Sequence, residues 1–97
     1  MENIVRTGCV SMTFVVYIIP YFRGGSWQLY CGHTNDAIRR WNEHHQRGFL
    51  GTKEKREMRI ISVHTTKKLA MNEEYRVKKL TRKKKDGLYV NGTVVNE

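Results

Sequence analysis

Residues 14–44 read FVVYIIPYFRGGSWQLYCGHTNDAIRRWNEH, and this stretch decides the fold. The run Phe14 to Ile19 consists of β-branched and aromatic residues and stops at Pro20, which predicts a buried strand. Arg23 to Ser26 reads RGGS, a pattern typical of a hairpin turn. We therefore expect Trp27 to Gly32 to return beside the first strand as its antiparallel neighbour.

The hairpin would place Tyr17 and Tyr30 on neighbouring strands at about the same height. A helix is expected directly after the hairpin. The pair Thr34-Asn35 offers a side chain that can cap the helix. A neighbouring face of the helix carries Arg40 and His44, four residues apart. Ile38, Trp41 and His45 stand at spacing i, i+3 and i+7 and therefore share one face of the helix. We expect this face to contact the core.

The rest of the chain predicts one more strand and one more long helix. Met58 to His64 is rich in isoleucine and valine and reads as a strand. A helix capped within Thr65-Thr66 would run to about Lys84 and stop before Asp86-Gly87. Leu88 to Val95 is β-prone, and we expect either a strand end or a frayed tail there.

The expected order is ββαβα, an α+β fold in which a small three-stranded antiparallel sheet is flanked by helices. A chain of 97 residues holds one core, so we expect a single domain over residues 1–97 with its core at about 13–90. The run 14–19 is far too short to span a bilayer. Cys9 and Cys31 are expected as free thiols, and no signal-peptide pattern opens the chain, which together predict an intracellular setting.

The charge predicts a polyanionic partner. The formal net charge is +9 and the sequence pI is about 9.9, and a small domain this basic most often binds nucleic acid. An anionic membrane is the rival, but no basic helix with a broad apolar face stands out. The basic stretch after residue 66 would follow a nucleic-acid backbone or, alternatively, form a solvated face or a localisation signal. The residues predicted to bind nucleic acid are Arg39, Lys53, Lys78, Lys79, Arg82, Lys83 and Lys84.

Hydrolysis of a phosphodiester needs a group that activates water, a cation that stabilises the negative charge of the pentavalent transition state, and a metal that stabilises the leaving oxygen. Five short motifs carry such residue types in order along the chain: Val16-Tyr17-Ile18, Tyr30-Cys31-Gly32, Gly32-x-Thr34-x-Asp36, Arg40-Trp41-x-x-His44, and Glu74 in the second long helix. Their order and spacing resemble the GIY-YIG nuclease domain over roughly residues 13–90, and most closely the short stand-alone proteins of its YhbQ-like branch.

The sequence departs from the family pattern at a few positions. Valine stands at residue 15 or 16 where the first motif often has glycine, and Cys31 stands where isoleucine is usual. Both are strand-interior positions whose side chains need only pack, so we expect little effect. The asparagine found late in some members has only Asn91 as a candidate counterpart.

The resemblance implies a metal-dependent endonuclease that hydrolyses DNA phosphodiester bonds with one Mg²⁺ or Mn²⁺ ion. It assigns Tyr17 to water activation and Tyr30 to hydrogen bonding near the scissile phosphate or the metal's water. Arg40 would hold phosphate with its planar guanidinium, which lysine could not copy. His44 would relay a proton or bind phosphate.

Glu74 would hold the metal as an oxygen ligand, with Glu73 as the main alternative. Each of these residues also has a plain structural reading. The two tyrosines would pack within core strands. Arg40 would be a solvated side chain, and His44 would interact with the dipole at the helix end. Glu74 would pair with Lys78 at i+4. His33 and His64 have no partner at metal-ligand spacing and are interpreted as structural.

Little sequence preference is expected, because a domain of this size has no room for a separate recognition module. Selectivity would come from DNA shape or single-stranded character. The alternatives are a non-catalytic nucleic-acid-binding domain on the same fold and a basic protein that associates with RNA or ribosomes. RNA as the substrate, a protein partner, and the host process, of which DNA repair is one candidate, stay open.

Overall fold

The computed structural model describes residues 13–47 and 54–95, with the side chains of residues 45–47 excepted. In chain order the elements are β1 (Phe14–Arg23), β2 (Ser26–Thr34), α1 (Ala37–Arg47), β3 (Arg59–His64), α2 (Lys67–Lys78), α3 (Arg82–Val90) and β4 (Thr93–Val94). The strands form an antiparallel sheet in the order β2-β1-β3-β4. The α+β fold is confirmed, and it adds a third helix and a short fourth strand to the expected ββαβα order.

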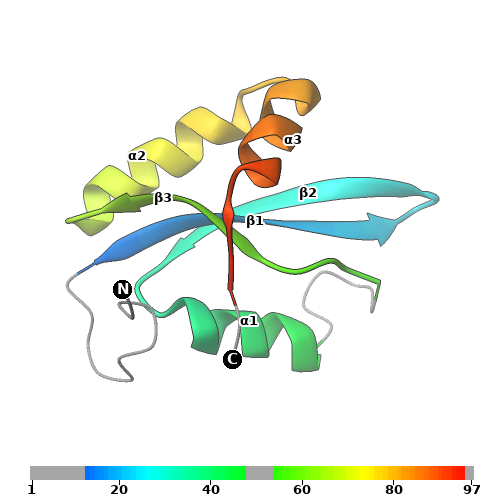
Figure 1. The fold of residues 1–97 in the computed structure, drawn as a ribbon, viewed down its shortest axis with the longest axis horizontal. Coiled ribbons are helices and arrows are strands. Elements are labelled where there is room, and N and C mark those ends of the chain that lie inside the picture. Colours follow the sequence, from blue (N-terminus) through cyan, green and yellow to red (C-terminus); the bar gives the residue numbers. More distant parts are fainter. Residues whose placement is uncertain (1–12, 48–53, 96–97) are drawn as a thin grey trace.

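The sheet is the middle of three layers. Figure 1 shows α1 on one side of it and α2 with α3 on the other. Successive residues of the central strand β1 point to opposite faces, as the strand period of two requires, so the sheet has a core on each side. The core on the α1 side holds Val15, Tyr17, Ile19 and Ala37. The core on the α2 side holds Val16, Ile18, Cys31, Ala70 and Val77.

A two-residue turn closes the hairpin of β1 and β2. Gly24 and Gly25 have φ angles of 66° and 86°, values that residues with a Cβ adopt only at a cost. Such a turn matches the right-handed twist of the two strands. The register that it fixes sets Tyr17 opposite Gly32 and puts Tyr30 two pairs further along, opposite Ile19. The tyrosines therefore lie on neighbouring strands, as predicted.

The prediction that β1 ends at Pro20 is wrong, since the strand continues to Arg23. The backbone nitrogen of Arg56 donates to the carbonyl oxygen of Pro20 at 2.9 Å. The amide and carbonyl of one strand residue point to the same side, so the amide hydrogen that proline lacks would also face residues 54–56. Pro20 therefore costs no hydrogen bond between β1 and β2, and it pairs with Leu29 in that ladder.

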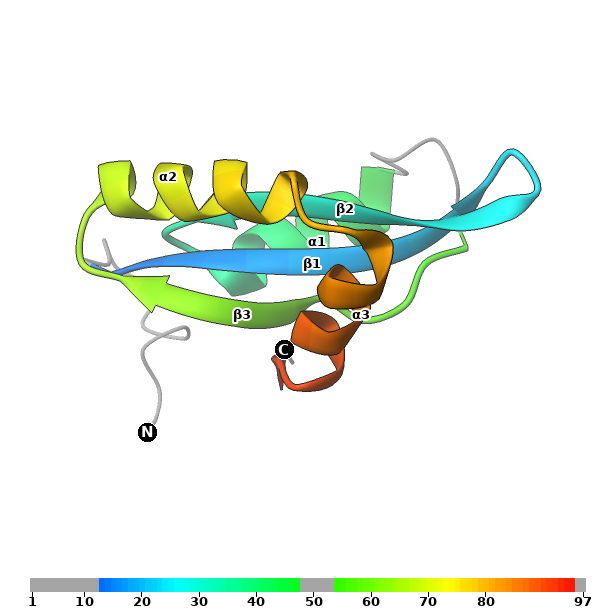
Figure 2. The same ribbon diagram turned by 90° about the horizontal axis from the view of Figure 1, so that it is seen from above.

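The prediction of one long helix up to about Lys84 is also wrong, because α2 ends at Lys78 and α3 begins at Arg82. Thr81 caps α3 in an extended conformation, and its side chain accepts a hydrogen bond from the backbone nitrogen of Lys84. The connecting Leu80 packs against the core on the α2 side. The two helices point in different directions (Figure 2), so the basic residues of this region do not form one stripe.

The segment Leu88 to Val95 was expected as a strand end or a tail, and it divides into two parts. Its first residues complete α3, and Thr93–Val94 form β4, which pairs with β3. The backbone nitrogen of Val95 donates to the carbonyl oxygen of Met58 at 3.0 Å. This segment therefore extends the sheet at the edge opposite β2.

Cys31 is a buried free thiol, as expected, and burial raises its pKa to about 12. Cys9 lies outside the described residues, so the prediction of a second free thiol stays a prediction. Within the described ranges, no helix is both long enough and apolar enough to cross a membrane.

Candidate functional site

Three rings meet on the α1 side of the sheet: Tyr17 from β1, Tyr30 from β2 and His44 from α1. The ring centroids are 6.2 Å apart for the two tyrosines, 5.9 Å for Tyr17 and His44, and 5.4 Å for Tyr30 and His44. The Tyr17 hydroxyl lies 3.2 Å from Nε2 of His44, within hydrogen-bond distance. Tyr17 and His44 are only 2% and 1% exposed, so this contact is closed to solvent. The structure thus brings together three of the predicted site residues.

The sequence pattern placed His45, not His44, on the core face of the helix. The side chain of His45 lies outside what the structure describes, whereas His44 is buried. Ala37, Trp41 and His44 stand at i, i+4 and i+7 and pack toward the sheet or its tyrosines. Alanine and histidine mark a helical face weakly, which is why this stripe was missed.

Gly32 makes room for the Tyr17 hydroxyl. A Cβ on Gly32 would lie 2.6 Å from Oη of Tyr17 and 2.8 Å from its Cζ. These distances are too short for any other residue at position 32 without moving the tyrosine. The glycine that closes the Tyr30-Cys31-Gly32 motif therefore fixes where the Tyr17 ring lies, a role that sequence reasoning did not assign.

Both partners of the Tyr17–His44 contact are neutral near pH 7. Burial raises the pKa of Tyr17 well above its ordinary value; the neighbouring Tyr30 and Glu74 raise it further, and Arg40 opposes them. Burial also lowers the pKa of His44 to about 4, assisted by the positive charges of Arg40 and Lys55. A neutral imidazole beside a neutral phenol can accept the phenolic proton.

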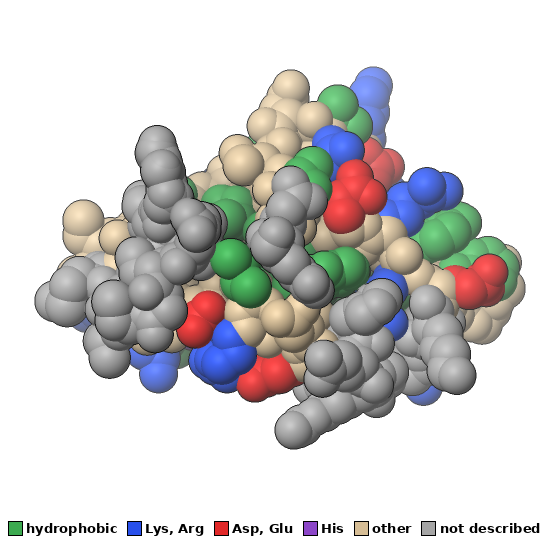
Figure 3. All heavy atoms as spheres, turned by 60° about the horizontal axis from the view of Figure 1, so that its bottom comes forward, with side chains coloured by type: hydrophobic (Ala, Val, Ile, Leu, Met, Phe, Trp, Pro, Cys, Tyr) green, Lys and Arg blue, Asp and Glu red, His purple; other side chains and the backbone are tan. Residues whose placement is uncertain are grey.

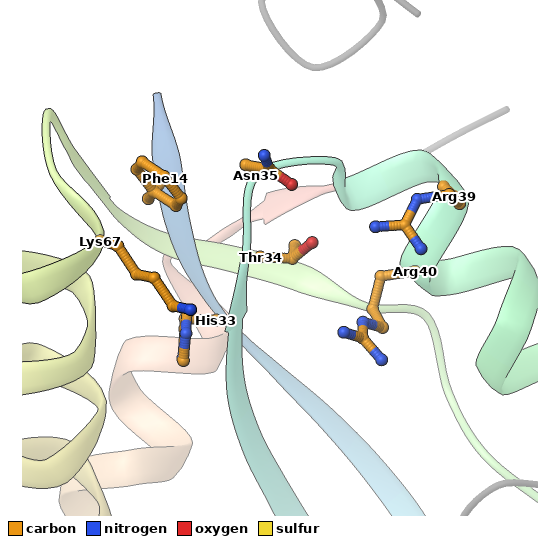
Figure 4. A pocket seen from close by; sticks show the side chains of 7 residues that line it. All are labelled: Phe14, His33, Thr34, Asn35, Arg39, Arg40 and Lys67. Carbon is orange, nitrogen blue, oxygen red and sulfur yellow. The ribbon is translucent and has the colours of Figure 1, made fainter. Parts of the chain in front are cut away.

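Arg40 lies one helical turn before His44 and lines an open cavity of ≈ 380 Å³. Its Nε is buried and has no hydrogen-bond partner among the described residues, and its Nη1 lies 3.5 Å from Oε1 of Glu43. Figure 4 shows the guanidinium groups of Arg39 and Arg40 turned toward β2 from α1. Phe14, His33, Thr34 and Lys67 share the cavity wall.

Glu74 lies on the α2 side of the sheet. Its Oε1 is 2.6 Å from Nδ1 of His33, and its Oε2 is 2.6 Å from Nζ of Lys78. Burial of the carboxyl group opposes ionisation, but the hydrogen bonds from Lys78 and His33 outweigh it and lower the pKa of Glu74. Glu73 instead pairs with Arg76 on the surface, where its Oε2 lies 2.6 Å from Nη2 of Arg76.

His33, which the sequence interpretation takes as structural because it has no partner at metal-ligand spacing, has a hydrogen-bonding partner in the structure. It holds one oxygen of Glu74, a residue 41 positions away in the sequence. No local spacing rule relates residues on a strand and on a later helix, so no sequence signal pointed to this pair. His64, by contrast, bonds to Ser62 on its own strand at 2.8 Å, which agrees with a structural reading.

The two parts of the site meet around the edge of β2, which is an edge strand of the sheet. The charges of Arg40 and Glu74 act on the pKa of Tyr17 in opposite directions, since Arg40 lowers it and Glu74 raises it. His33 lines the large cavity and also a smaller one of ≈ 210 Å³ beside Glu74. Of the five residues implied by the motifs, Tyr17, Tyr30, Arg40 and His44 thus lie on the α1 side of the sheet and Glu74 lies on the α2 side. Arg40 lines the large cavity and Glu74 lines the smaller one.

Among the described residues, those predicted to bind nucleic acid lie on three helices or, for Lys79, at a helix end, and several are neutralised by carboxylates. Arg39 pairs with Asp36 and Glu43, and Arg82 pairs with Asp86. Figure 3, with the α1 side brought forward, shows acidic side chains interspersed with basic ones rather than a uniform basic face. The remaining candidates are Lys78 on Glu74, Lys79 over the Tyr75 ring, the exposed Lys83 and Lys84, and Lys53, which lies outside the described residues.

Comparison with known proteins identifies the family to which the sequence is similar. The sequence model of the GIY-YIG catalytic domain matches residues 13–86. The UPF0213 protein YazA of Bacillus subtilis is 42% identical over 71 residues, which are 70% of this chain and 69% of YazA. A UPF0213 protein of Vibrio campbellii is 36% identical over 83 residues, 82% of this chain and 77% of its own length. A UPF0213 protein of Bacillus velezensis is 41% identical over 60% of this chain and 62% of its own. No solved structure matches the chain significantly.

Proposed function

The chain belongs to the GIY-YIG catalytic domain family, a family of nuclease type, and on that premise we propose that it is a metal-dependent endonuclease that hydrolyses phosphodiester bonds in DNA. We infer little sequence preference, with selectivity for strand structure or single-stranded character. The observation that carries the proposal is the buried Tyr17–His44 hydrogen bond beside Arg40, with Glu74 around the same edge of β2.

Arg40 is the proposed phosphate ligand. Its buried Nε lacks a hydrogen-bond partner among the described residues, and its guanidinium faces a cavity open to solvent. The end of its guanidinium, which faces the cavity, could hold a phosphate oxygen with charge-assisted hydrogen bonds. The planar guanidinium can also follow the charge that develops on phosphorus during in-line attack.

Tyr17 and His44 are the proposed proton path. As water attacks phosphorus and the bond to the leaving oxygen breaks, a proton of that water passes to Oη of Tyr17. The phenolic proton passes at the same time to Nε2 of His44, which is neutral and 3.2 Å away. The raised pKa of Tyr17 makes a standing phenolate unfavourable, so a paired transfer suits this site better than a pre-ionised tyrosine. Tyr30 would orient the phosphate or the water from the neighbouring strand.

The family implies one divalent ion, Mg²⁺ or Mn²⁺, and the residues present fit it. No cluster of three or more His, Cys, Asp or Glu occurs in the part of the chain that the structure describes, so an all-protein cage is not formed there. Magnesium is commonly held by one or two carboxylates together with substrate phosphate and water. Glu74 would be that carboxylate, with His33 orienting it, and the ion would offset charge on the scissile phosphate and the leaving oxygen.

One observation favours a second candidate, a nucleic-acid-binding domain without turnover. Both oxygens of Glu74 are taken, one by His33 and one by Lys78, so an ion must displace at least the lysine. If it cannot, the domain would bind its polyanion through the basic residues without cutting it.

A nicking assay separates the two functions. Supercoiled plasmid and a labelled single strand are incubated with Mg²⁺, Mn²⁺ or EDTA, with the parent protein, Glu74→Gln, and Glu73→Gln as the matched control from the same helix. Metal-dependent cutting that is lost in Glu74→Gln and kept in Glu73→Gln supports the endonuclease. Salt-sensitive binding without any cutting supports the binding domain instead.

A further inference from the structure

The ≈ 380 Å³ cavity at the edge of β2 holds more positive charge than one phosphate needs. Roughly 300–1,000 Å³ is the usual size of a small-molecule site. Arg39 and Arg40 line it from α1, and Lys67 lines it from the start of α2. In the described lining there is no Asp or Glu. The proposed cleavage uses only Arg40, so the other cations need a separate explanation.

The three cations of this cavity differ in how far they are neutralised. Arg39 lies 2.7 Å from Glu43 and 3.6 Å from Asp36, and Arg40 lies 3.5 Å from Glu43. Lys67 has no carboxylate partner within the described part of the chain, and its side chain extends from α2 toward β2 (Figure 4). A lysine that points into a cavity without a counterion is the group there most available to an anion from outside.

Lys67 and Arg40 lie on opposite sides of β2 in Figure 4, although both line the same cavity. A nucleic-acid strand that presents one phosphate to Arg40 would carry its next phosphate along the cavity. The cavity wall also includes the amide side chain of Asn35 and the ring of Phe14. An amide can donate to phosphate, and an aromatic ring can pack on a sugar or a base.

We propose that this cavity binds the phosphodiester next to the one that is cut, and that Lys67 is the positioning residue that holds it. The inference rests on the proposed endonuclease function and deepens it, because it defines a substrate with at least two consecutive phosphates. Lys67 does not take part in the reaction itself. It sets the register of the strand, so its loss raises KM and leaves kcat nearly unchanged.

The binding arm of the test needs no cleavage. Fluorescence anisotropy in EDTA gives the Kd of a labelled oligonucleotide at several salt concentrations for the parent, Lys67→Gln and Lys68→Gln. Lys68 is the next residue of the same helix, is exposed, and does not line the cavity. We expect Lys67→Gln to raise Kd about tenfold and to reduce the slope of log K against log salt by about 0.7–0.9, the value of one phosphate contact. Lys68→Gln should change Kd less than about twofold.

The cleavage arm locates the phosphate. Oligonucleotides carry one neutral methylphosphonate at successive positions on either side of the cut. The parent and Lys68→Gln should show a raised KM when the neutral group occupies one position adjacent to the cut, and Lys67→Gln should be insensitive at that position. Equal sensitivity of Lys67→Gln and Lys68→Gln would overturn the proposal, as would equal Kd and salt slopes in the binding arm.

The binding and cleavage experiments together also distinguish a failure of the Lys67 proposal from a failure of the proposed endonuclease function. If no variant cuts DNA, the endonuclease proposal fails while the binding arm still decides whether Lys67 holds a phosphate. If the parent cuts DNA and Lys67→Gln behaves as Lys68→Gln does, the endonuclease stands and the role of Lys67 is refuted.

Discussion

The hydroxyl of Tyr17 lies 3.2 Å from Nε2 of His44, and the two side chains are 2% and 1% exposed. They come from β1 and α1, 27 residues apart, and meet because Gly32 leaves space for the phenol. A buried hydrogen bond between two neutral groups of different proton affinity provides a short path for one proton. The first two predictions test that path and the protonation of its histidine.

Replacing the imidazole with an amide should stop the proton transfer but keep a hydrogen bond. Glutamine at position 44 can accept from Tyr17 but cannot take its proton, so we expect His44→Gln to lower kcat about 10²–10⁴-fold. The Kd for DNA should change less than about twofold. Single-turnover cleavage and anisotropy measure the two quantities. His64→Gln is the matched control, since His64 bonds only to Ser62 within its own strand among the contacts described. A kcat for His44→Gln near that of the parent would show that His44 only positions the tyrosine.

The neutral state of His44 should make the protein less stable in mild acid. The unfolded imidazole takes up a proton near pH 6.5, whereas the folded one does so only near its pKa of about 4. Between these values the unfolded state binds the extra proton, so stability falls as pH falls. The free energy of unfolding should drop by about 1.5–2 kcal/mol between pH 7 and pH 5.

Urea unfolding at pH 7 and pH 5 measures this drop. His44→Gln should lose most of the difference between the two pH values, because glutamine does not titrate, and His64→Gln should keep it. The folded pKa values of Glu57, Glu73 and Glu74 are lowered, so these carboxylates add a smaller loss of stability in the same direction as pH falls toward 5. This part is common to the parent and both variants and cancels in the comparison. An unchanged pH dependence in His44→Gln would mean that another group controls it.

The elements that depend on residues close in sequence were predicted, and those that depend on distant residues were not. The hairpin, the two tyrosines on its neighbouring strands and the helix after it depend on residues close in sequence, and all three were predicted. Pro20 was misjudged because the side to which its missing amide would point depends on residues 54–56. Thr81 was missed as a cap because helix periodicity continues on both sides of it. The His33–Glu74 contact joins two elements that only the folded sheet brings together.

Adding one methyl group at position 32 should disturb the site more than the fold. In Gly32→Ala the new Cβ would lie 2.6 Å from the Tyr17 hydroxyl, so the ring must shift and its contact with His44 must change. We expect a loss of stability of about 1–3 kcal/mol and a loss of cleavage like that of His44→Gln. Gly87→Ala is the control, since a Cβ there meets nothing within 4 Å inside α3. It should stabilise the protein by about 0.5–1 kcal/mol.

A second substitution shows whether the Tyr17 hydroxyl causes the damage. Tyr17→Phe removes the closest atom of the clash, although Cζ stays 2.8 Å from the new Cβ. The Tyr17→Phe/Gly32→Ala protein should therefore recover part of the lost stability and none of the activity. Additive effects of the two changes on the urea midpoint would mean that the two residues do not interact.

Removing the Lys78 ammonium group should make Glu74 a better metal ligand. Its Nζ lies 2.6 Å from Oε2 of Glu74 and must leave before an ion can use that oxygen. Lys78→Met keeps the aliphatic stem and removes the competing charge, so we expect Mn²⁺ to bind about three- to fivefold more tightly, in line with an ion pair of up to about 1 kcal/mol. Electron paramagnetic resonance of free Mn²⁺, measured without DNA, gives the Kd. Lys79→Met controls for the general loss of one positive charge, because Lys79 lies over the Tyr75 ring. Affinity that is unchanged in Lys78→Met, or raised equally in both variants, would show that the lysine does not compete with the ion at Glu74.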